Sequence, residues 1–257
     1  MPLGLRARDV LGVVREVQAS ASSGAPLVVL GVLAEELARE LRAGSDGRAV
    51  RTGGDSGAAA ALVVVVAGAP GAAEQRVLRE ATRRGTPVVL VRTDPRARVS
   101  LPYVLPSDVV ECEPGRGFPI PEIAAALAGA LGHDGVSLAA RLPVLRAAVC
   151  RRLIDAASRQ AAVVGLVPWS KGAHFPAMTL IQGRLVLDLA AAHGETIDGD
   201  RAPEVAAVAG TGLGLRALVR RLPVEVPFVG GITGYLGTRA IGEAALRRHS
   251  TGASAAS

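Results

Sequence analysis

The fold class is decided by the stretch ALVVVVAGAPGAAEQRVLREATRRGTPVVLVR, which covers residues 61–92. Its first seven residues are apolar without alternation, which is typical of a strand buried on both faces of a parallel sheet. Residues 72–84 then carry an apolar stripe at helical spacing that ends at Gly85, and residues 87–92 form a second apolar run. A strand, a helix and a strand in this order predict a parallel pair joined by a right-handed crossover.

The same alternation continues on both sides of this stretch. The further predicted elements are strands at residues 26–31, 48–52 and 108–112 and helices at residues 32–43 and 122–131. We therefore expect residues 1–136 to form an α/β domain with a doubly wound, mostly parallel sheet.

The second half of the chain predicts an all-α, glycine-rich domain over residues 137–249. Its predicted helices cover residues 141–166, 177–192, 204–222 and 227–248. The first two are joined by a short loop between prolines, which favours a helical hairpin. The last eight residues, 250–257, are small and polar and predict a disordered tail.

Composition limits the function. Of 257 residues, 49% are hydrophobic and 20% charged, which excludes a disordered chain. The net charge of +6 leaves nucleic-acid binding open as an alternative, but six aromatic residues offer few stacking platforms for bases, so we expect no nucleic-acid partner. The two cysteines, Cys112 and Cys150, form no disulfide framework, which indicates a cytoplasmic protein. The four histidines have no metal-ligand spacing.

The loop after the first predicted strand lacks the groups that hold a nucleotide's phosphates. Residues 31–41 contain no second glycine, no lysine and no serine or threonine, whereas a phosphate cradle needs freed backbone amides, a cation and a hydroxyl for magnesium. The single lysine, Lys171, comes about 140 residues later. Glu35 and Glu36 instead stand at the start of the predicted helix, where they stabilise its dipole. We expect no catalytic residue and no metal site.

Residues 61–96 resemble the back half of an Era-like or dynamin-like small GTPase domain. In that family, an acidic residue after the strand binds guanine, and Asp94 stands at its position, although Val91, Arg92 and Thr93 replace the expected Asn-Lys. The loop that backs the base corresponds to Gly115 and Gly117, with Glu113 where the family has lysine. The resemblance implies a degenerate P-loop GTPase-like domain, a pseudoenzyme without a cofactor. Binding or hydrolysis of GTP through unconventional phosphate contacts remains the alternative.

Residues 158–198 and 226–248 resemble the bacterial YcjF-type domain of unknown function. The matching positions are Pro168, Pro176, Gln182, Gly194, Gly230, Gly231, Gly237 and Thr238. That family often follows a GTPase-like domain and is regarded as membrane-associated, which implies the same order and location here. Trp169 and Lys171 depart from the small residues usual in its loop.

The glycines of the last predicted helix indicate close helix packing. Gly230 and Gly234 are four residues apart, a spacing that lets helix backbones touch in a membrane or in a soluble bundle, and both settings stay open. Trp169 suits either a membrane interface or a core gap. The uncharged runs of the second half are shorter than a membrane span.

These observations predict a membrane-associated or scaffolding protein. The GTPase-like domain would serve for docking, and Trp169, Lys171, Gly230 and Gly234 for contacts with lipid or another subunit. Its partner would be an anionic membrane surface, at the inner face of the cell membrane, or a protein, including a second copy of the chain.

Overall fold

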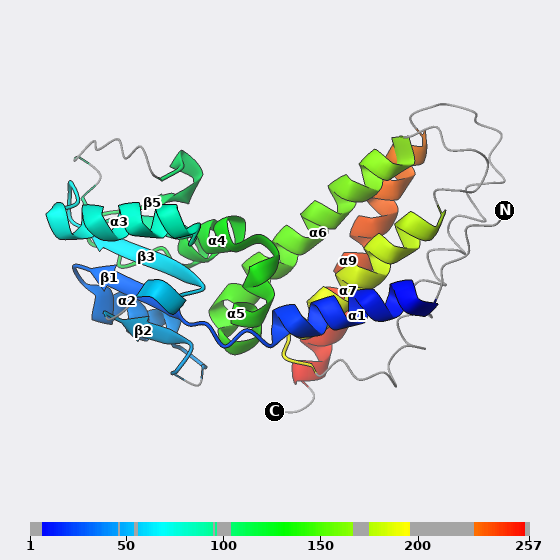
Figure 1. Cartoon of the computed structure of the whole chain (residues 1–257), viewed down its shortest axis with the longest axis horizontal. Coiled ribbons are helices and arrows are strands. Elements are labelled where there is room, and N and C mark those ends of the chain that lie inside the picture. The colour runs from blue at the N-terminus through cyan, green and yellow to red at the C-terminus, as the bar shows by residue number, and fades with distance from the viewer. Residues whose placement is uncertain are drawn as a thin grey trace. The chain divides into compact units, whose positions relative to one another are not determined.

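The computed structural model describes residues 7–45, 47–53, 56–94, 96, 104–166, 175–195 and 229–254. The chain divides into two compact units (Figure 1). Residues 22–149 form an α/β unit, and residues 1–21 with 150–257 form a helical unit. The expected α/β domain followed by helices is therefore present. The division differs from the expected boundaries, because helix α1 (Ala7–Ala21) groups with the helices of the second half and residues 137–149 group with the α/β unit.

The α/β unit is built on a five-stranded sheet in which every pair of neighbouring strands is parallel. The spatial order is β2-β1-β3-β4-β5. The strands are β1 (Leu27–Gly31), β2 (Val50–Thr52), β3 (Ala61–Val66), β4 (Val88–Arg92) and β5 (Val109–Glu111). The parallel sheet predicted from the apolar runs is thus confirmed, with strand ends within two residues of those expected.

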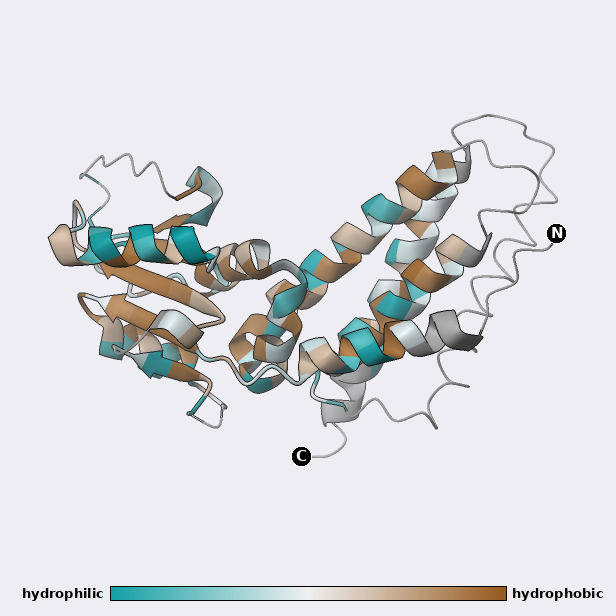
Figure 2. Cartoon of the chain, viewed as in Figure 1, coloured by the Kyte–Doolittle hydropathy of each residue, from teal (hydrophilic) through white to brown (hydrophobic). Residues whose placement is uncertain are grey.

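Strands β3 and β4 are apolar because both of their faces are covered. All six residues of β3 are buried, and Figure 2 shows the strands as the brown centre of the unit. One face packs Val28, Leu62, Val64 and Leu90 against helix α3 (Ala72–Arg84). Helix α2 (Ala34–Leu41) contacts β1 and β2, and helix α4 (Ile120–Leu131) contacts β4 and β5.

The order of strands reverses between β1 and β3. The chain passes from β1 through α2 to β2 in one direction, and from β3 through α3 to β4 in the other. Right-handed crossovers then place α2 and α3 on opposite faces of the sheet. In such sheets a crevice opens at the carboxyl ends of the strands where the order reverses, and ligands bind there. The turn after β1 lies at this point.

One stretch of the described residues, Ile120–Arg141, has the length and apolar composition of a membrane span. It consists of α4, a short turn and helix α5 (Gly135–Arg141), and Gly132 breaks the helix with a φ of +56°. Just over half of its apolar window is buried. Its buried residues, which include Ile123, Leu127 and Leu138, belong to the core of the protein.

The helical unit contains α1, most of α6 (Pro143–Leu166), α7 (Phe175–Ala192) and α9 (Val229–Ser254). Helix α7 contacts both α1 and α9. The three predicted helices at residues 141–166, 177–192 and 227–248 are confirmed. Helix α9 also runs through Ser254, into the segment expected to be a disordered tail, and the helix predicted at residues 204–222 lies outside the described residues.

Candidate functional site

The turn between β1 and α2 is shaped by a close approach of two backbones. Gly31 has a φ of +94°, and a Cβ atom there would lie 2.0 Å from the carbonyl oxygen of Val65 in β3. The next amide, of Val32, donates a hydrogen bond of 3.0 Å to the same oxygen. Only glycine fits this position, because any side chain would collide with the neighbouring strand. The single glycine of the turn therefore serves packing within the sheet.

Leu33 enters α2 in a left-handed conformation, with a φ of 55°. It is the N-cap of the helix and makes no side-chain capping bond. Its side chain is 48% exposed and that of Val32 is 44% exposed. A left-handed leucine costs about 1–2 kcal/mol. The turn that faces the crevice thus presents two aliphatic side chains to solvent.

Two carboxylates follow directly after these aliphatic residues. Glu35 and Glu36 lie in the first turn of α2 and are exposed. The hydroxyl of Thr52, at the end of β2, donates a hydrogen bond to the carboxylate of Glu35. A pocket of about 470 Å³ lies between these groups, lined by the ends of β1 and β2, Leu33 and the two acids. The crevice of the α/β unit is therefore apolar at its base and acidic at its rim.

This turn does not suit a nucleotide's phosphates. Phosphates bind where several backbone amides, a lysine and a hydroxyl converge at a helix start. Here the amide of Val32 is used by Val65, and Glu35 and Glu36 place negative charge where the phosphates would lie. The two carboxylates interact favourably with the positive end of the helix dipole, but they repel a polyanion such as a triphosphate.

Asp94, the expected guanine contact, lies just after β4 and is exposed. Its Oδ1 accepts a hydrogen bond of 3.0 Å from the amide of Arg96, so the carboxylate closes a turn of its own loop. The preceding Thr93 donates both its amide and its hydroxyl to the carbonyl of Val66. The hydrogen bonds of Thr93 to β3 thus hold the loop that places Asp94 at the carboxyl edge of the sheet.

Gly115 and Gly117 lie in the loop after β5, at the same edge as the Asp94 loop because β4 and β5 are parallel neighbours. Both glycines have positive φ angles, and a Cβ at either would meet nothing within 4 Å. They give the loop its shape and leave open space beside it. Glu113, at the position of the family's lysine, pairs with Arg116 at 2.8 Å on the surface.

Both cysteines are buried, and neither forms a disulfide. Burial raises the pKa of the Cys112 thiol, which disfavours the reactive thiolate. Among the described residues no group of histidine, cysteine, aspartate and glutamate could hold a metal ion.

The glycine face of α9 lies against α6. A Cβ at Gly231 would meet Leu166 at 2.8 Å, one at Gly234 would meet the carbonyl oxygen of Ala161 at 2.7 Å, and one at Gly242 would meet Ile154 at 2.6 Å. The expected close packing is therefore present inside the helical unit. Gly234 of the predicted pair takes part, together with Gly231 and Gly242. For Gly230 the structure describes only its place in the first turn of α9. Gly234 is consequently covered by the chain's own helices and does not face lipid or another subunit.

A buried polar contact joins α7 to α9 in this unit. The side-chain amide of Gln182 in α7 donates a buried hydrogen bond of 3.1 Å to the hydroxyl of Thr238 in α9. Both residues are among the positions that carry the resemblance to the YcjF-type domain. A buried pair of this kind helps to hold two helices in register, because slippage would break the hydrogen bond between them.

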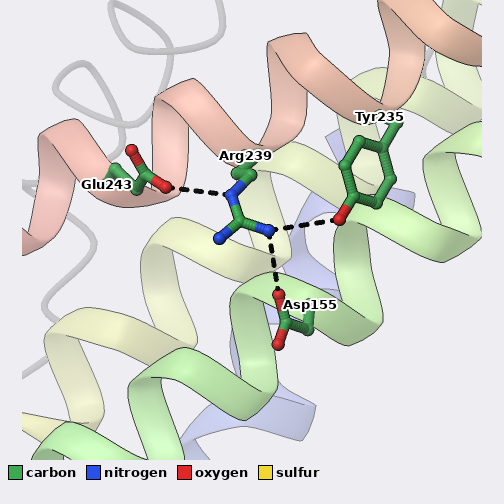
Figure 3. Close-up of polar contacts among 4 residues, drawn as sticks. All are labelled: Asp155, Tyr235, Arg239 and Glu243. Atoms are coloured by element: carbon green, nitrogen blue, oxygen red, sulfur yellow. Dashed lines mark hydrogen bonds and ion pairs between the residues drawn. The ribbon is translucent and has the colours of Figure 1, made fainter.

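A surface network joins α9 to α6 (Figure 3). Arg239 lies 3.4 Å from Asp155 of α6, 3.0 Å from Glu243 and 3.1 Å from the hydroxyl of Tyr235. Its hydrogen bonds to Tyr235 and Glu243 raise the pKa of Arg239. The network lies on the surface of the α6–α9 pair and links the two helices at Asp155 and Arg239.

Four exposed aliphatic side chains continue along this side. They are Val163, Leu166, Ile232 and Leu236. Helical spacing places Ile232 and Leu236 in line with Arg239 and Leu166 in line with Asp155, with Val163 about a quarter turn further round α6. Because Gly231 lies against Leu166, the two pairs occupy the same end of the antiparallel helices. We call these four residues the α6–α9 patch. The sequence alone does not show that these four residues are exposed, because the packing of the neighbouring helices decides which apolar residues are covered.

Trp169 and Lys171, the expected interaction residues of the loop, lie outside the described residues. No protein-family model, no curated protein and no solved structure matches this chain.

Proposed function

We propose that this protein is non-catalytic and acts by contact, as a scaffold whose α/β unit has the frame of a degenerate P-loop GTPase without a phosphate site. It would work in the cytoplasm, in part at the inner face of the cell membrane. The proposal rests on one observation. The turn after β1, where a GTPase would hold phosphate and magnesium, carries Leu33 in a left-handed conformation followed by two exposed acids, Glu35 and Glu36.

The charge at the start of α2 disfavours phosphate binding. Phosphoryl transfer depends on positioned cations around the transferred group. In the described part of the chain, no basic side chain forms an ion pair with Glu35 or Glu36, so their charges are not neutralised there. A triphosphate would therefore meet two uncompensated negative charges at the helix start.

Turnover tests this proposal. Purified protein incubated with magnesium and GTP or ATP should release phosphate no faster than the heat-denatured protein. Turnover that disappears in Asp94→Ala would contradict the proposal, since it would show that the guanine-binding position serves a working site. Asp108→Ala, at an exposed turn in the same unit, is the matched control.

A second candidate function, attachment to an anionic membrane, is favoured by the α6–α9 patch. Val163 is 63% exposed and Ile232 58% exposed, and they belong to two adjacent helices. Arg159 of α6 is exposed and stands one turn before Val163. Apolar side chains with arginine beside them suit the boundary between headgroups and acyl chains, and the arginine favours anionic lipids.

Vesicle flotation tests the membrane candidate. We expect the protein to float with vesicles containing phosphatidylglycerol and to stay at the bottom with pure phosphatidylcholine. Ile232→Asp with Leu236→Asp should abolish flotation, whereas Leu105→Asp, at an exposed leucine of the α/β unit, should not. Flotation that is unchanged in the double variant would refute attachment through the patch.

A further inference from the structure

We propose that residues 204–222, which lie outside the described part of the chain, form a helix that packs on the α6–α9 patch and completes the helical unit. The patch then has an occupant within the chain, in place of the lipid of the second candidate above. Three observations support this packing: the directions of α7 and α9, the length of the segment that joins them, and the sequence of that segment. The packing goes beyond the scaffold function and does not depend on it.

Helices α7 and α9 run in the same direction. The terminal methyl group of Met178 in α7 would lie 2.7 Å from a Cβ at Gly234 in α9. One turn further along both helices, Gln182 donates its hydrogen bond to Thr238. The chain therefore leaves α7 at one end of the unit and has to enter α9 at the opposite end.

The connection between these two helices has to span the length of the unit. Helix α7 ends in a tight turn, in which Gly194 has a φ of +78° and the amide of Glu195 donates to the carbonyl of Ala190. Because α7 and α9 are parallel, this turn lies level with the last turns of α9, about 30 Å from Val229 at the start of that helix. A helix over residues 204–222 covers about 28 Å and leaves a turn on either side of it.

The sequence of the segment favours a helix of this length. Pro203 precedes it and Pro223 follows it, and proline is common at the start of a helix and ends one. The aliphatic residues on one face recur at helical spacing, at Val205, Val208, Leu215, Val219 and Leu222. Gly212 falls on the same face, where a close approach to a neighbouring helix compensates for its low helix propensity. An aliphatic face of this kind needs an apolar surface to cover it.

The α6–α9 patch lies at the end of the unit to which the segment returns. Ile232 follows the start of α9 closely, and Leu166, which ends α6, lies against Gly231. The four side chains of the patch are 49–63% exposed. The glycine contacts bring α6 and α9 close together, so that one further helix can touch both. A helix antiparallel to α9 places its last turns beside the patch.

Residues 204–222 also have an advantage over any separate occupant, because the chain joins them to the patch. Residues 223–228 are the only link between the segment and α9. A short link of this kind gives the segment an effective concentration in roughly the millimolar range at the patch. A lipid surface or a second copy of the chain has to compete with that concentration.

Disulfide crosslinking of the full chain tests the packing. Two cysteine pairs join the aliphatic face of the segment to the patch, Val219→Cys with Ile232→Cys and Leu215→Cys with Leu236→Cys. The matched control is Ala217→Cys with Leu236→Cys, because Ala217 lies on the opposite face of the same predicted helix. Under a mild oxidant, we expect both test pairs to form an intramolecular disulfide faster than the control by roughly fivefold or more, since a disulfide needs close and well-directed Cβ atoms.

Hydrogen exchange of the unaltered chain gives a second measurement that needs no substitution. We expect the amides of residues 208–222 to exchange slower by roughly tenfold or more than those of a free peptide of the same sequence, because a packed helix protects its amides. Peptide mapping under non-reducing conditions identifies the crosslinked residues, and the native Cys112 and Cys150 are buried.

Four results would overturn the proposal. Equal crosslinking of the test and control pairs, or exchange of residues 208–222 at the rate of the free peptide, would show that the segment does not pack as a helix. Disulfides formed mainly between two chains would assign the patch to a second copy. Protection that arises only with vesicles containing phosphatidylglycerol would assign it to lipid. Phosphate release is unaffected by any of these results, so the scaffold proposal is tested separately.

Discussion

Replacement of Gly31 by alanine probes the contact that forms the candidate site. A Cβ there would lie 2.0 Å from the backbone oxygen of Val65, about 1.5 Å inside the usual contact distance of roughly 3.5 Å. The oxygen belongs to a central strand and cannot rotate away, so β1 and β3 must separate. The separation also strains the hydrogen bond from the amide of Val32 to this oxygen.

The expected loss follows from three terms. A side chain at a positive φ costs about 1–2 kcal/mol, overpacking about 1–3 kcal/mol and the weakened hydrogen bond about 1 kcal/mol. We therefore expect Gly31→Ala to lower the free energy of unfolding by about 3–6 kcal/mol. Gly115→Ala is the matched control, because Gly115 also has a positive φ, of 81°, but a Cβ there meets nothing within 4 Å. It should lose only about 1–2 kcal/mol.

Urea denaturation followed by circular dichroism measures both variants, with the free energies compared at a common slope. Losses that agree within about 0.5 kcal/mol would refute the reasoning. That result would mean that the two strands part at little cost and that Gly31 serves the loop only through its backbone freedom.

Three further predictions concern the helices and the buried thiol. Gly234→Ala should lower the unfolding temperature of its unit by roughly 2–8 °C, from overpacking of about 1–2 kcal/mol, whereas Gly129→Ala, in an open position of α4, should raise stability by up to about 1 kcal/mol. Thermal scans measure both, and a stabilised Gly234→Ala would contradict the packing. Thr238→Val should cost about 1–3 kcal/mol, and a double-mutant cycle with Gln182→Leu should give a coupling of about 0.5–1.5 kcal/mol; no coupling would mean that the buried bond adds nothing. Alkylation of Cys112 by iodoacetamide should be slower than in the unfolded chain and should need a higher pH, because burial raises the pKa of the thiol. The raised pKa also has a consequence for stability. The neutral thiol of the folded protein contributes its stability below the ordinary thiol pKa, and this contribution is lost as the pH rises above it. Equal rates in folded and unfolded protein would contradict this burial.

The sheet could be predicted from the sequence because its signal is local. Strands β3 and β4 are continuous apolar runs, and α3 begins and ends as predicted at Ala72 and Arg84. Helix α1 was not predicted, although Val10, Val13, Val14 and Val17 recur in it at helical spacing. Its neighbour is α7, more than 150 residues away, and this distant pairing is not visible in the local pattern.

The glycine spacing predicted a close helix contact, and Gly234 of the predicted pair makes one. Gly231 and Gly242 also meet α6, although they were not part of that pair. The spacing of glycines indicates that a helix has a face suited to close packing, whereas the neighbouring helix decides which residues of that face are in contact. The sequence therefore could not show that this face is covered inside the unit.

The acidic turn was partly predictable. Glu35 and Glu36 at a helix start and the missing glycines and lysine are visible in the sequence. The left-handed backbone at Leu33 is not, because leucine rarely adopts it and nothing local requires it. The pocket depends on this conformation and on the parallel pairing that brings Thr52 beside α2.

The most direct test of the central claim is calorimetric titration of magnesium GTP into the full chain, because it asks whether the turn after β1 can hold phosphates at all. We expect no saturable heat at millimolar nucleotide, and the same absence in the variant Glu35→Gln with Glu36→Gln. A stoichiometric site with a dissociation constant in the micromolar range, together with slowed hydrogen exchange of the amides of residues 31–37, would contradict the account.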